Sequence, residues 1–224
     1  MKFWQVISEL IGFIYLFCWA FCNLPQFFLI QRRKSVAGFS MTFQVLNMIG
    51  FLWYLIYLIY GYIYQHKHNT TKSIVWQDFA WCGCTLVVVY AIAVQCVIYR
   101  KTITETIHPF YQASIVGIFT ITAYNLFLVK ANFLPWYTVA DGGGEAYSFM
   151  HFCGYAKTYI SFIKYFPQCR LNFRRKRTTG FSIFQVVLDV TGALTSFAQS
   201  MINAWYVLTV SLAHICPPLH PSPT

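Results

Sequence analysis

Long apolar runs recur along the chain and are separated by short polar or basic stretches. Each run approaches the length of about 20 mainly apolar residues that a helix needs to cross a bilayer. The pattern therefore predicts six membrane-spanning helices, near residues 6–30, 43–64, 76–99, 109–130, 147–169 and 183–212.

One stretch of the sequence occurs twice, 142 positions apart. Residues 25–50 and 167–192 are identical at twelve of 26 positions without a gap, including Pro-Gln, Arg-Arg-Lys, Gly-Phe-Ser and the last Gly. A match of this length indicates an internal repeat. In each copy we expect one apolar helix to end at Pro-Gln, a basic loop to follow, and a second helix to start after Gly-Phe-Ser.

The two Pro-Gln pairs, Pro25-Gln26 and Pro167-Gln168, mark predicted kinks. Proline removes one backbone hydrogen bond from a helix and clashes with the carbonyl four residues back. Within a membrane the freed carbonyl needs another partner or a wet cavity. A lone Pro-Gln pair would more simply place a polar residue near a helix end, but its duplication favours four gating residues around a cavity that changes shape.

The composition excludes an ordinary soluble domain. Of the 224 residues, 58% are hydrophobic and 10% are charged, whereas a soluble domain has about 25% charged residues. The predicted fold class is therefore all-α, a polytopic membrane protein. The net charge of +10 does not point to nucleic acid, because the basic residues lie beside the apolar helices.

Cysteine and histidine give only weak signals of a metal site. Seven of the eight cysteines lie in or beside apolar segments, where cysteine behaves as a small hydrophobe. Cys82 with Cys84, or His66 with His68, could bind a metal, but core packing and a solvated loop are the simpler interpretations. No phosphate-binding loop or His-Glu-x-x-His pattern is present, so we expect no metal, no cofactor and no enzymatic activity.

The basic residues of the connections predict how the chain is oriented. Ten Lys and Arg follow the first, third and fifth predicted helices, against four on the other side. Because Lys and Arg collect on the cytoplasmic side, the N-terminus should be lumenal. The sequon at Asn69 then falls on the lumenal side, where it could be glycosylated.

The two Pro-Gln helices are separated by four crossings, so the repeats are parallel. The natural unit is three helices, the fourth predicted helix is a link, and the seventh helix of this scheme is missing. We therefore expect a first bundle (1–100), a link with a lumenal loop (101–145), an incomplete second bundle (146–212) and a proline-rich tail (213–224). Such a chain would be a truncated product or one whose end comes from an altered reading frame.

Two aspartates and two lysines are the candidates for chemistry, because an ionisable group costs about 2.5–3.5 kcal/mol at the centre of a bilayer. Asp189 could exchange protons, or it could cap a helix or pair with a lysine. Asp78 could accept a proton or cap the third predicted helix. Lys157 and Lys164 lie two turns apart and could hold carboxylates of a small substrate, although Lys164 could instead snorkel to the headgroups.

Taken together, these residues resemble the PQ-loop transporter superfamily. The second copy, with Lys-Tyr-Phe-Pro-Gln at 164–168 and Leu-Asp-Val-Thr-Gly at 188–192, is similar to the cystinosin family of lysosomal proton–cystine symporters. The resemblance covers roughly residues 20–210. It implies a multi-pass protein of the lysosomal membrane whose partners are the lipid bilayer, protons and the cystine that it exports to the cytosol.

The resemblance also implies roles for single residues. Asp189 and, by a looser alignment, Asp78 would couple protons, while Asn47, Lys157 and Lys164 would line the substrate site. A further site residue would be Gln185, which stands where the family carries an asparagine. The family's long N-terminal region, its seventh helix and its C-terminal sorting signal have no counterpart in this sequence.

Three other functions are alternatives to cystine export. The chain could be another carrier of the superfamily, for cationic amino acids or sugars, but two intramembrane lysines would repel a cation and a sugar carrier needs no buried aspartate. It could be a receptor or scaffold that binds peptides without net flux. It could also be a non-transporting fragment that pairs with a full-length copy.

Overall fold

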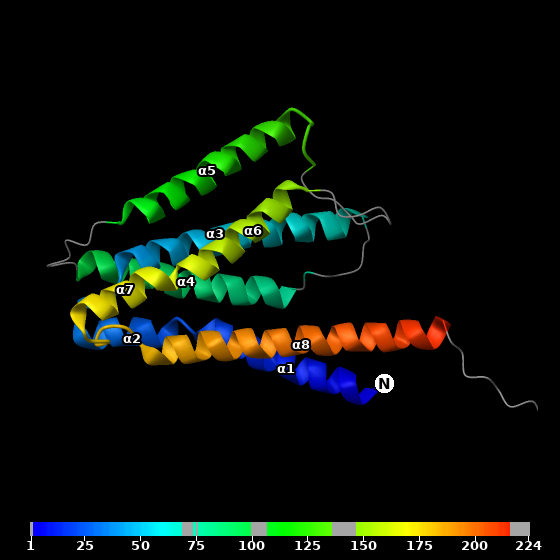
Figure 1. Ribbon diagram of the computed structural model, residues 1–224, viewed down its shortest axis with the longest axis horizontal. Helices are drawn as coiled ribbons and strands as arrows, with labels where there is room; N and C mark the ends of the chain where they lie inside the picture. Colours follow the sequence, from blue (N-terminus) through cyan, green and yellow to red (C-terminus); the bar gives the residue numbers. More distant parts are fainter. Residues whose placement is uncertain (1, 69–73, 75, 100–106, 136–146, 216–224) are drawn as a thin grey trace, which may run out of the picture. The chain divides into compact units, whose positions relative to one another are not determined.

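The computed structural model of the chain describes residues 2–68, 74, 76–99, 107–135 and 147–215, and all regular structure within these ranges is α-helical (Figure 1). The all-α prediction is therefore confirmed. The predicted glycosylation site Asn69 and residues 216–224 of the predicted tail lie outside the described ranges. The helices are α1 (Lys2–Phe21), α2 (Leu24–Arg33), α3 (Met41–His68), α4 (Trp76–Ile98), α5 (Pro109–Lys130), α6 (Phe149–Ile163), α7 (Tyr165–Arg175) and α8 (Ile183–Ile215).

Four helical stretches of the described residues are long and apolar enough to cross a membrane, which agrees with the predicted polytopic class. They are Val6–Arg33, Met41–Lys67, Asp78–Ile98 and Pro109–Lys130. The two other predicted spans coincide with α6 plus α7 and with α8. That these last segments also cross the membrane stays a prediction.

Both predicted helices that carry a Pro-Gln pair are broken into two. The first break separates Phe21 from Leu24, and the second lies at Lys164. The expectation that each helix would end at Pro-Gln is wrong, because α2 and α7 continue beyond it for about two turns. Proline has no N–H for the carbonyl four residues back, and for Pro25 and Pro167 that carbonyl belongs to the last residue of α1 and α6, respectively. Each proline thus lies in the first turn of a new helix, where its missing N–H is not needed.

The chain forms two compact units. One contains residues 1–22 and 183–224, and the other contains residues 23–182. The division of the chain into bundles at residues 100, 145 and 212 stays a prediction.

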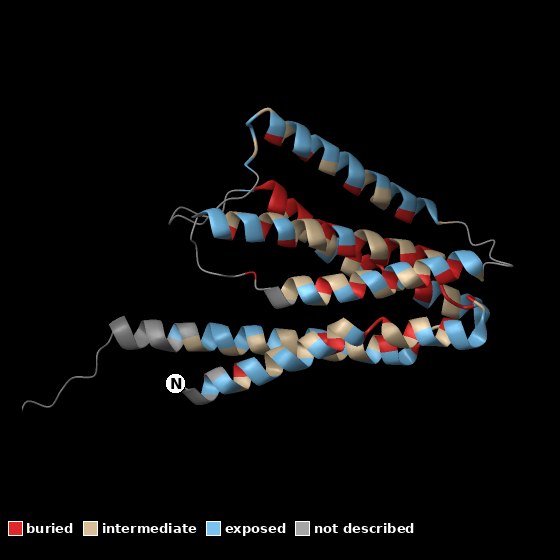
Figure 2. Ribbon diagram, turned by 180° about the vertical axis from the view of Figure 1, so that it is seen from behind, coloured by how far each residue is buried: buried red, intermediate tan, exposed pale blue. Residues whose placement is uncertain are grey.

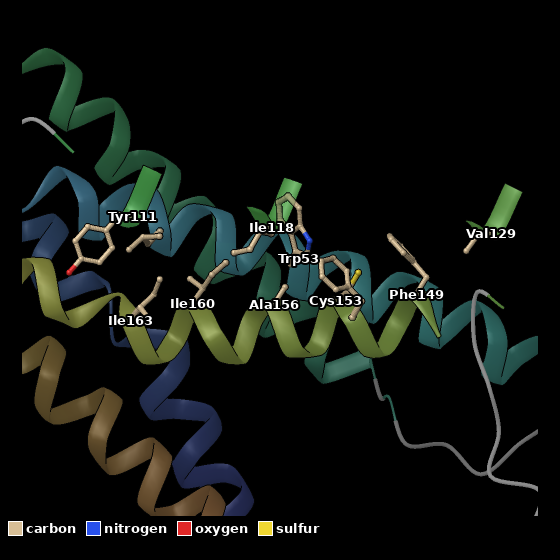
Figure 3. Close-up of a cluster of buried hydrophobic side chains, with 11 residues drawn as sticks. Trp53, Tyr111, Ile118, Val129, Phe149, Cys153, Ala156, Ile160 and Ile163 are labelled. Carbon is tan, nitrogen blue, oxygen red and sulfur yellow. The ribbon is translucent and has the colours of Figure 1, made fainter. Parts of the chain in front are cut away.

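Within the larger unit, α3 packs along α6, and α4 packs on α3. Apolar side chains of α6, among them Cys153, Ala156 and Ile160, lie beside Trp53 of α3 (Figure 3), and Leu46 of α3 belongs to the same buried cluster. At Gly50 the two helices approach so closely that an added Cβ would lie 3.0 Å from the Ile160 side chain. Most of α5 is exposed (Figure 2), as expected for a helix that faces lipid.

In the smaller unit, α1 pairs with α8 over most of its length. An added Cβ on Gly192 of α8 would lie 2.5 Å from the Trp19 ring, so a small residue is needed there. Gln199 Nε2 donates a hydrogen bond to the Ser8 carbonyl (2.8 Å), and the Ser8 hydroxyl donates to Asn203 Oδ1 (2.8 Å). Small residues at close approach and polar bonds between helices are the usual means of helix association in membranes.

The two helix pairs correspond to one another through the repeat. In each pair, the first helix of one repeat packs against the second helix of the other: α1 with α8, and α3 with α6. Gly50 and Gly192, which are repeat equivalents, are the points of close approach in both pairs. Neither repeat therefore forms its helix pairs from its own residues alone.

Candidate functional site

The glutamine of the first Pro-Gln pair is bound to the second repeat. Gln26 is fully buried, with 0% of its surface exposed. Its Nε2 donates to the Gly180 carbonyl (3.1 Å), and the backbone N–H of Ser182 donates to its Oε1 (2.8 Å). One amide side chain thus satisfies both a backbone acceptor and a backbone donor of the second Gly-Phe-Ser turn.

The second Pro-Gln pair makes the reciprocal contact. Gln168 Nε2 donates to the Gly38 carbonyl (2.9 Å), and the backbone N–H of Ser40 donates to Gln168 Oε1 (2.7 Å). The same Nε2 also donates to Asn172 Oδ1 (2.9 Å). We call this arrangement the crossed bracket: Gln26 with the turn 180–182, and Gln168 with the turn 38–40.

The two Gly-Phe-Ser turns also pack directly on each other. Gly38 and Gly180 have φ angles of +98° and +113°, which L side chains rarely adopt. A Cβ on Gly38 would collide with the Thr179 carbonyl oxygen, and a Cβ on Gly180 would collide with that of Ala37. Only glycine fits at either position, for reasons of both conformation and space.

Aromatic side chains fill the space beneath these turns. The rings of Phe39 and Phe181, which are repeat equivalents, are stacked with centroids 6.2 Å apart and planes 14° apart. Phe43 contacts Phe181 and Tyr165 with centroids 5.5 Å and 5.3 Å away. Because this packing excludes water, the bracket's hydrogen bonds lie in a medium of low polarity, where losing one is costly.

The two breaks in the Pro-Gln helices are linked by a chain of polar side chains. Asn23 lies in the first break and Lys164 in the second, and Asn47 of α3 lies between them. Asn47 Nδ2 donates to Asn23 Oδ1 (3.2 Å), and the Lys164 ammonium donates to Asn47 Oδ1 (3.4 Å). All three residues are buried. A ligand that contacts Asn47 would therefore influence both breaks.

The two candidate lysines face the same helix. The Lys157 ammonium lies over the Phe51 ring of α3, 4.2 Å from its centroid, and the Lys164 ammonium lies 5.9 Å from the ring centroid of Phe43, also on α3. Such stacking of a cation on an aromatic ring is favourable, the more so when both are desolvated. Lys164 is buried, so its ammonium does not snorkel to the headgroups. The structure thus brings Asn47, Lys157 and Lys164 together along α3.

Asp189 and Gln185 belong to α8 in the smaller unit. Asp189 is half-buried and Gln185 is buried. Asp189 lies one helical turn before Gly192, so the two share a face of α8, and Gly192 faces Trp19 of α1. Asp189 is the repeat equivalent of Asn47. The side of α8 that carries it is therefore the side that pairs with α1.

Asp78 lies in the first turn of α4, where a carboxylate is favoured by the helix dipole. It is half-buried. Cys82, one turn further along α4, is fully buried. Cys82 and Cys84 are free thiols, one buried and one exposed, so they do not face a common site. No three His, Cys, Asp or Glu side chains of the described ranges converge as metal ligands would.

Two features of this site escaped the sequence analysis. Asn23 was not singled out, although a polar residue two positions before Pro-Gln in an apolar run is a usable signal. The exchange of partners between Pro-Gln and Gly-Phe-Ser was also missed. Both motifs occur once in each repeat, so sequence alone cannot decide whether a glutamine binds the turn of its own repeat or that of the other.

Known proteins resemble the chain along most of its length. Cystinosin homolog of Dictyostelium discoideum is 28% identical over 221 residues, covering 92% of this chain and 72% of the relative. Cystinosin of Bos taurus is 28% identical, covering 90% of this chain and 54% of the relative. Cystine transporter of Saccharomyces cerevisiae is 28% identical, covering 86% and 77%. The chain thus spans about half of the bovine protein and about three quarters of the other two.

None of these relatives bears the name of an enzyme, and one is named a transporter, in keeping with the expectation that the chain has no enzymatic activity. Residues 7–67 and 149–209 each match the family described as PQ loop repeat. These two segments contain the Pro-Gln pairs, the Gly-Phe-Ser turns and all residues of the crossed bracket. Together they make up more than half of the sequence, and the chain therefore belongs to the PQ loop repeat family.

Proposed function

We propose that this chain is a carrier that moves cystine across a membrane together with a proton. Membership of the PQ loop repeat family and relatives named cystinosin and cystine transporter support the substrate. The observation that carries the proposal is the polar chain from Asn23 through Asn47 to Lys164. A substrate held at Asn47 would act on the break in each Pro-Gln helix at once, which is what a carrier needs.

The chemistry of cystine suits the residues along α3. Each end of the molecule carries a carboxylate and an ammonium group. In the proposal, Lys157 and Lys164 bind the two carboxylates of cystine. The Asn47 amide donates a hydrogen bond to the carboxylate at one end of cystine and accepts one from the ammonium group at that end. A substrate carboxylate would replace the aromatic ring as the partner of Lys157, since a charge-assisted hydrogen bond is stronger than a neutral one.

Asp189 is the proposed proton carrier, with Asp78 as a second group. Asp189 stands at the repeat position of Asn47, so one repeat has an amide where the other has a group that can gain and lose a proton. Burial favours the neutral form of a carboxyl, whereas a nearby ammonium favours the charged form. The proposed direction is from the acidic lysosomal lumen to the cytosol, down the proton gradient.

The crossed bracket is the proposed gate at the basic end. While its four hydrogen bonds to the two turns are intact, α2 and α7 are fixed to each other's repeats. The helix breaks before Pro25 and Pro167 allow α2 and α7 to tilt without bending α1 and α6. Opening towards the basic side then requires that Gln26 and Gln168 release their turns.

The test is uptake of radiolabelled cystine by cells that carry the protein at their surface, at acidic and at neutral external pH. We expect uptake at acidic pH, strong reduction in Lys164→Met, and loss of the pH dependence in Asp189→Asn. Lys130→Met is the matched control, because Lys130 is exposed at the end of α5. Full, pH-dependent uptake by Asp189→Asn would reject its role in coupling. Absence of cystine uptake by well-folded wild-type protein at the surface would reject the proposed function.

A further inference from the structure

The crossed bracket brings the two basic blocks of the sequence to one place. We call the surface formed by residues 32–34, Arg170 and residues 174–177 the basic patch. All eight of its side chains are exposed. The Arg175 guanidinium lies directly over Gly38, in the turn that follows the first block. Blocks that are 142 positions apart in sequence therefore form one surface within the larger unit.

The residues that the structure describes place no acidic partner beside the basic patch. None of its side chains forms a salt bridge with an acidic residue of the described ranges. Arg32, Arg33, Arg174 and Arg175 lie in the last turns of α2 and α7, where the helix dipole favours cations. The dipole attracts about half a charge at each helix end, so it neutralises only a small part of a surface with eight positive charges.

The residue types of the basic patch fit a ligand that carries phosphate groups. Six of the eight residues are arginine, whose planar fork binds phosphate oxygens through two parallel hydrogen bonds. Each block contains the lysine that caps its helix in the left-handed conformation, Lys34 with φ 47° and Lys176 with φ 49°.

The patch also adjoins exposed aromatic side chains of α7. On α7, Phe166, Arg170 and Phe173 follow one another at spacings of four and three residues, so they share a face. Phe166 and Phe173 are 53% and 85% exposed. Basic side chains beside exposed apolar residues such as phenylalanine are typical of helix surfaces that contact lipid headgroups and the upper part of the acyl chains. A ligand of the patch would therefore be a lipid of the adjoining leaflet.

We propose that the basic patch binds a phosphoinositide lipid whose inositol ring carries at least two phosphates. A singly charged lipid meets only one block at a time, whereas a headgroup with several phosphates can contact both. Clusters of four to eight basic residues beside a membrane helix bind such lipids. This site is separate from the proposed cystine site and does not depend on it.

The test uses the full-length chain in neutral detergent and a fluorescent dioctanoyl phosphatidylinositol bisphosphate. We expect saturable binding that weakens with salt, and binding about 25-fold weaker in Arg174→Gln/Arg175→Gln, from the contribution of two basic residues. Arg32→Gln/Arg33→Gln, in the other repeat, should weaken binding to a similar degree. The matched control is Lys67→Gln/Lys130→Gln, which removes two exposed charges from other helix ends and should bind like wild type.

Three results would overturn the proposal. One is wild-type affinity in both arginine variants that elute as folded, monodisperse protein. Another is equal binding of dioctanoyl phosphatidylserine at matched total charge, which would indicate general attraction to an anionic surface. The third is tighter binding of soluble inositol hexakisphosphate than of the lipid in competition, which would indicate a free polyphosphate rather than a membrane lipid. Preference for the lipid, lost in both arginine variants and kept in the control, supports it.

Discussion

Replacement of Gln26 by leucine tests whether the crossed bracket holds the larger unit together. Leucine is similar in size and buries without strain, but it can neither donate to the Gly180 carbonyl nor accept from the Ser182 N–H. Both backbone groups would stay buried without their partner. Gln168→Leu makes the equivalent change at the turn 38–40.

The expected loss of stability follows from the two buried backbone groups that each substitution leaves without a hydrogen-bond partner. A buried donor or acceptor left unsatisfied costs about 1–3 kcal/mol, so each variant should lose about 2–6 kcal/mol of stability. For a chain of this length, 1 kcal/mol corresponds to roughly 2–4 °C in Tm. We therefore expect the Tm of each variant to fall on the order of 10 °C.

The buried thiols of the larger unit provide the assay. Cys82, Cys96 and Cys153 are fully buried and will react with a thiol-specific fluorescent probe only when the unit unfolds. Cys84 and Cys169 are exposed and supply a constant initial signal. Gln112→Leu is the matched control, because Gln112 is exposed on α5 and its replacement should leave Tm within about 2 °C of the wild-type value.

The double variant Gln26→Leu/Gln168→Leu tests whether the two halves of the bracket cooperate. The turns that they hold pack on each other, and residues in one network typically show coupling of about 0.5–3 kcal/mol. We expect the double variant to lose less stability than the sum of the single losses, since the first loss already loosens the second turn. Single variants as stable as Gln112→Leu, or strict additivity, would refute the crossed bracket as a cooperative structural element.

Three further predictions concern other parts of the structure. Gly38→Ala and Gly180→Ala should each lower Tm by several degrees, because a Cβ would collide with the opposite turn, whereas Gly83→Ala, with open space around the added atom, should leave Tm unchanged or raise it slightly. Asn47→Ala removes two buried hydrogen bonds and should cost about 2–4 kcal/mol in the thiol assay, together with a loss of cystine uptake. Gln199→Leu removes one bond to the backbone of α1 and should cost only about 0.6 kcal/mol, which a thermal scan would register as a shift of a few degrees at most.

The sequence was sufficient to predict the helical class, the extent of most helices and the existence of a repeat. The predicted helix at 109–130 has the observed bounds, because Pro109 starts it and the apolar run ends at Lys130. Apolar length fixes such an element without reference to the rest of the chain. The repeat was likewise visible from identity alone, and it correctly paired Asn47 with Asp189 as equivalent positions.

The Pro-Gln helices could not be predicted correctly from local sequence. A proline in an apolar run signals a break, but hydrophobicity does not show that a new helix begins just before it and continues into the basic segment. What stabilises α2 and α7 is the bond from each glutamine to a turn more than 125 residues away. The orientation of the Lys164 side chain likewise depends on a residue distant in sequence. Snorkelling to the headgroups and burial against Asn47 require opposite orientations, and local sequence does not distinguish them.

The exchange of partners between repeats has a consequence for biosynthesis. Gln26 and its acceptor at Gly180 are separated by 154 residues. At typical elongation rates of about 5–20 residues per second, roughly 8–30 s pass between the appearance of the two at the ribosome. During that interval the first repeat is already translated, while its glutamine still lacks its final partner. Nascent chains that stall before residue 180 should therefore be recognised as unfinished and degraded, however well their early helices have inserted.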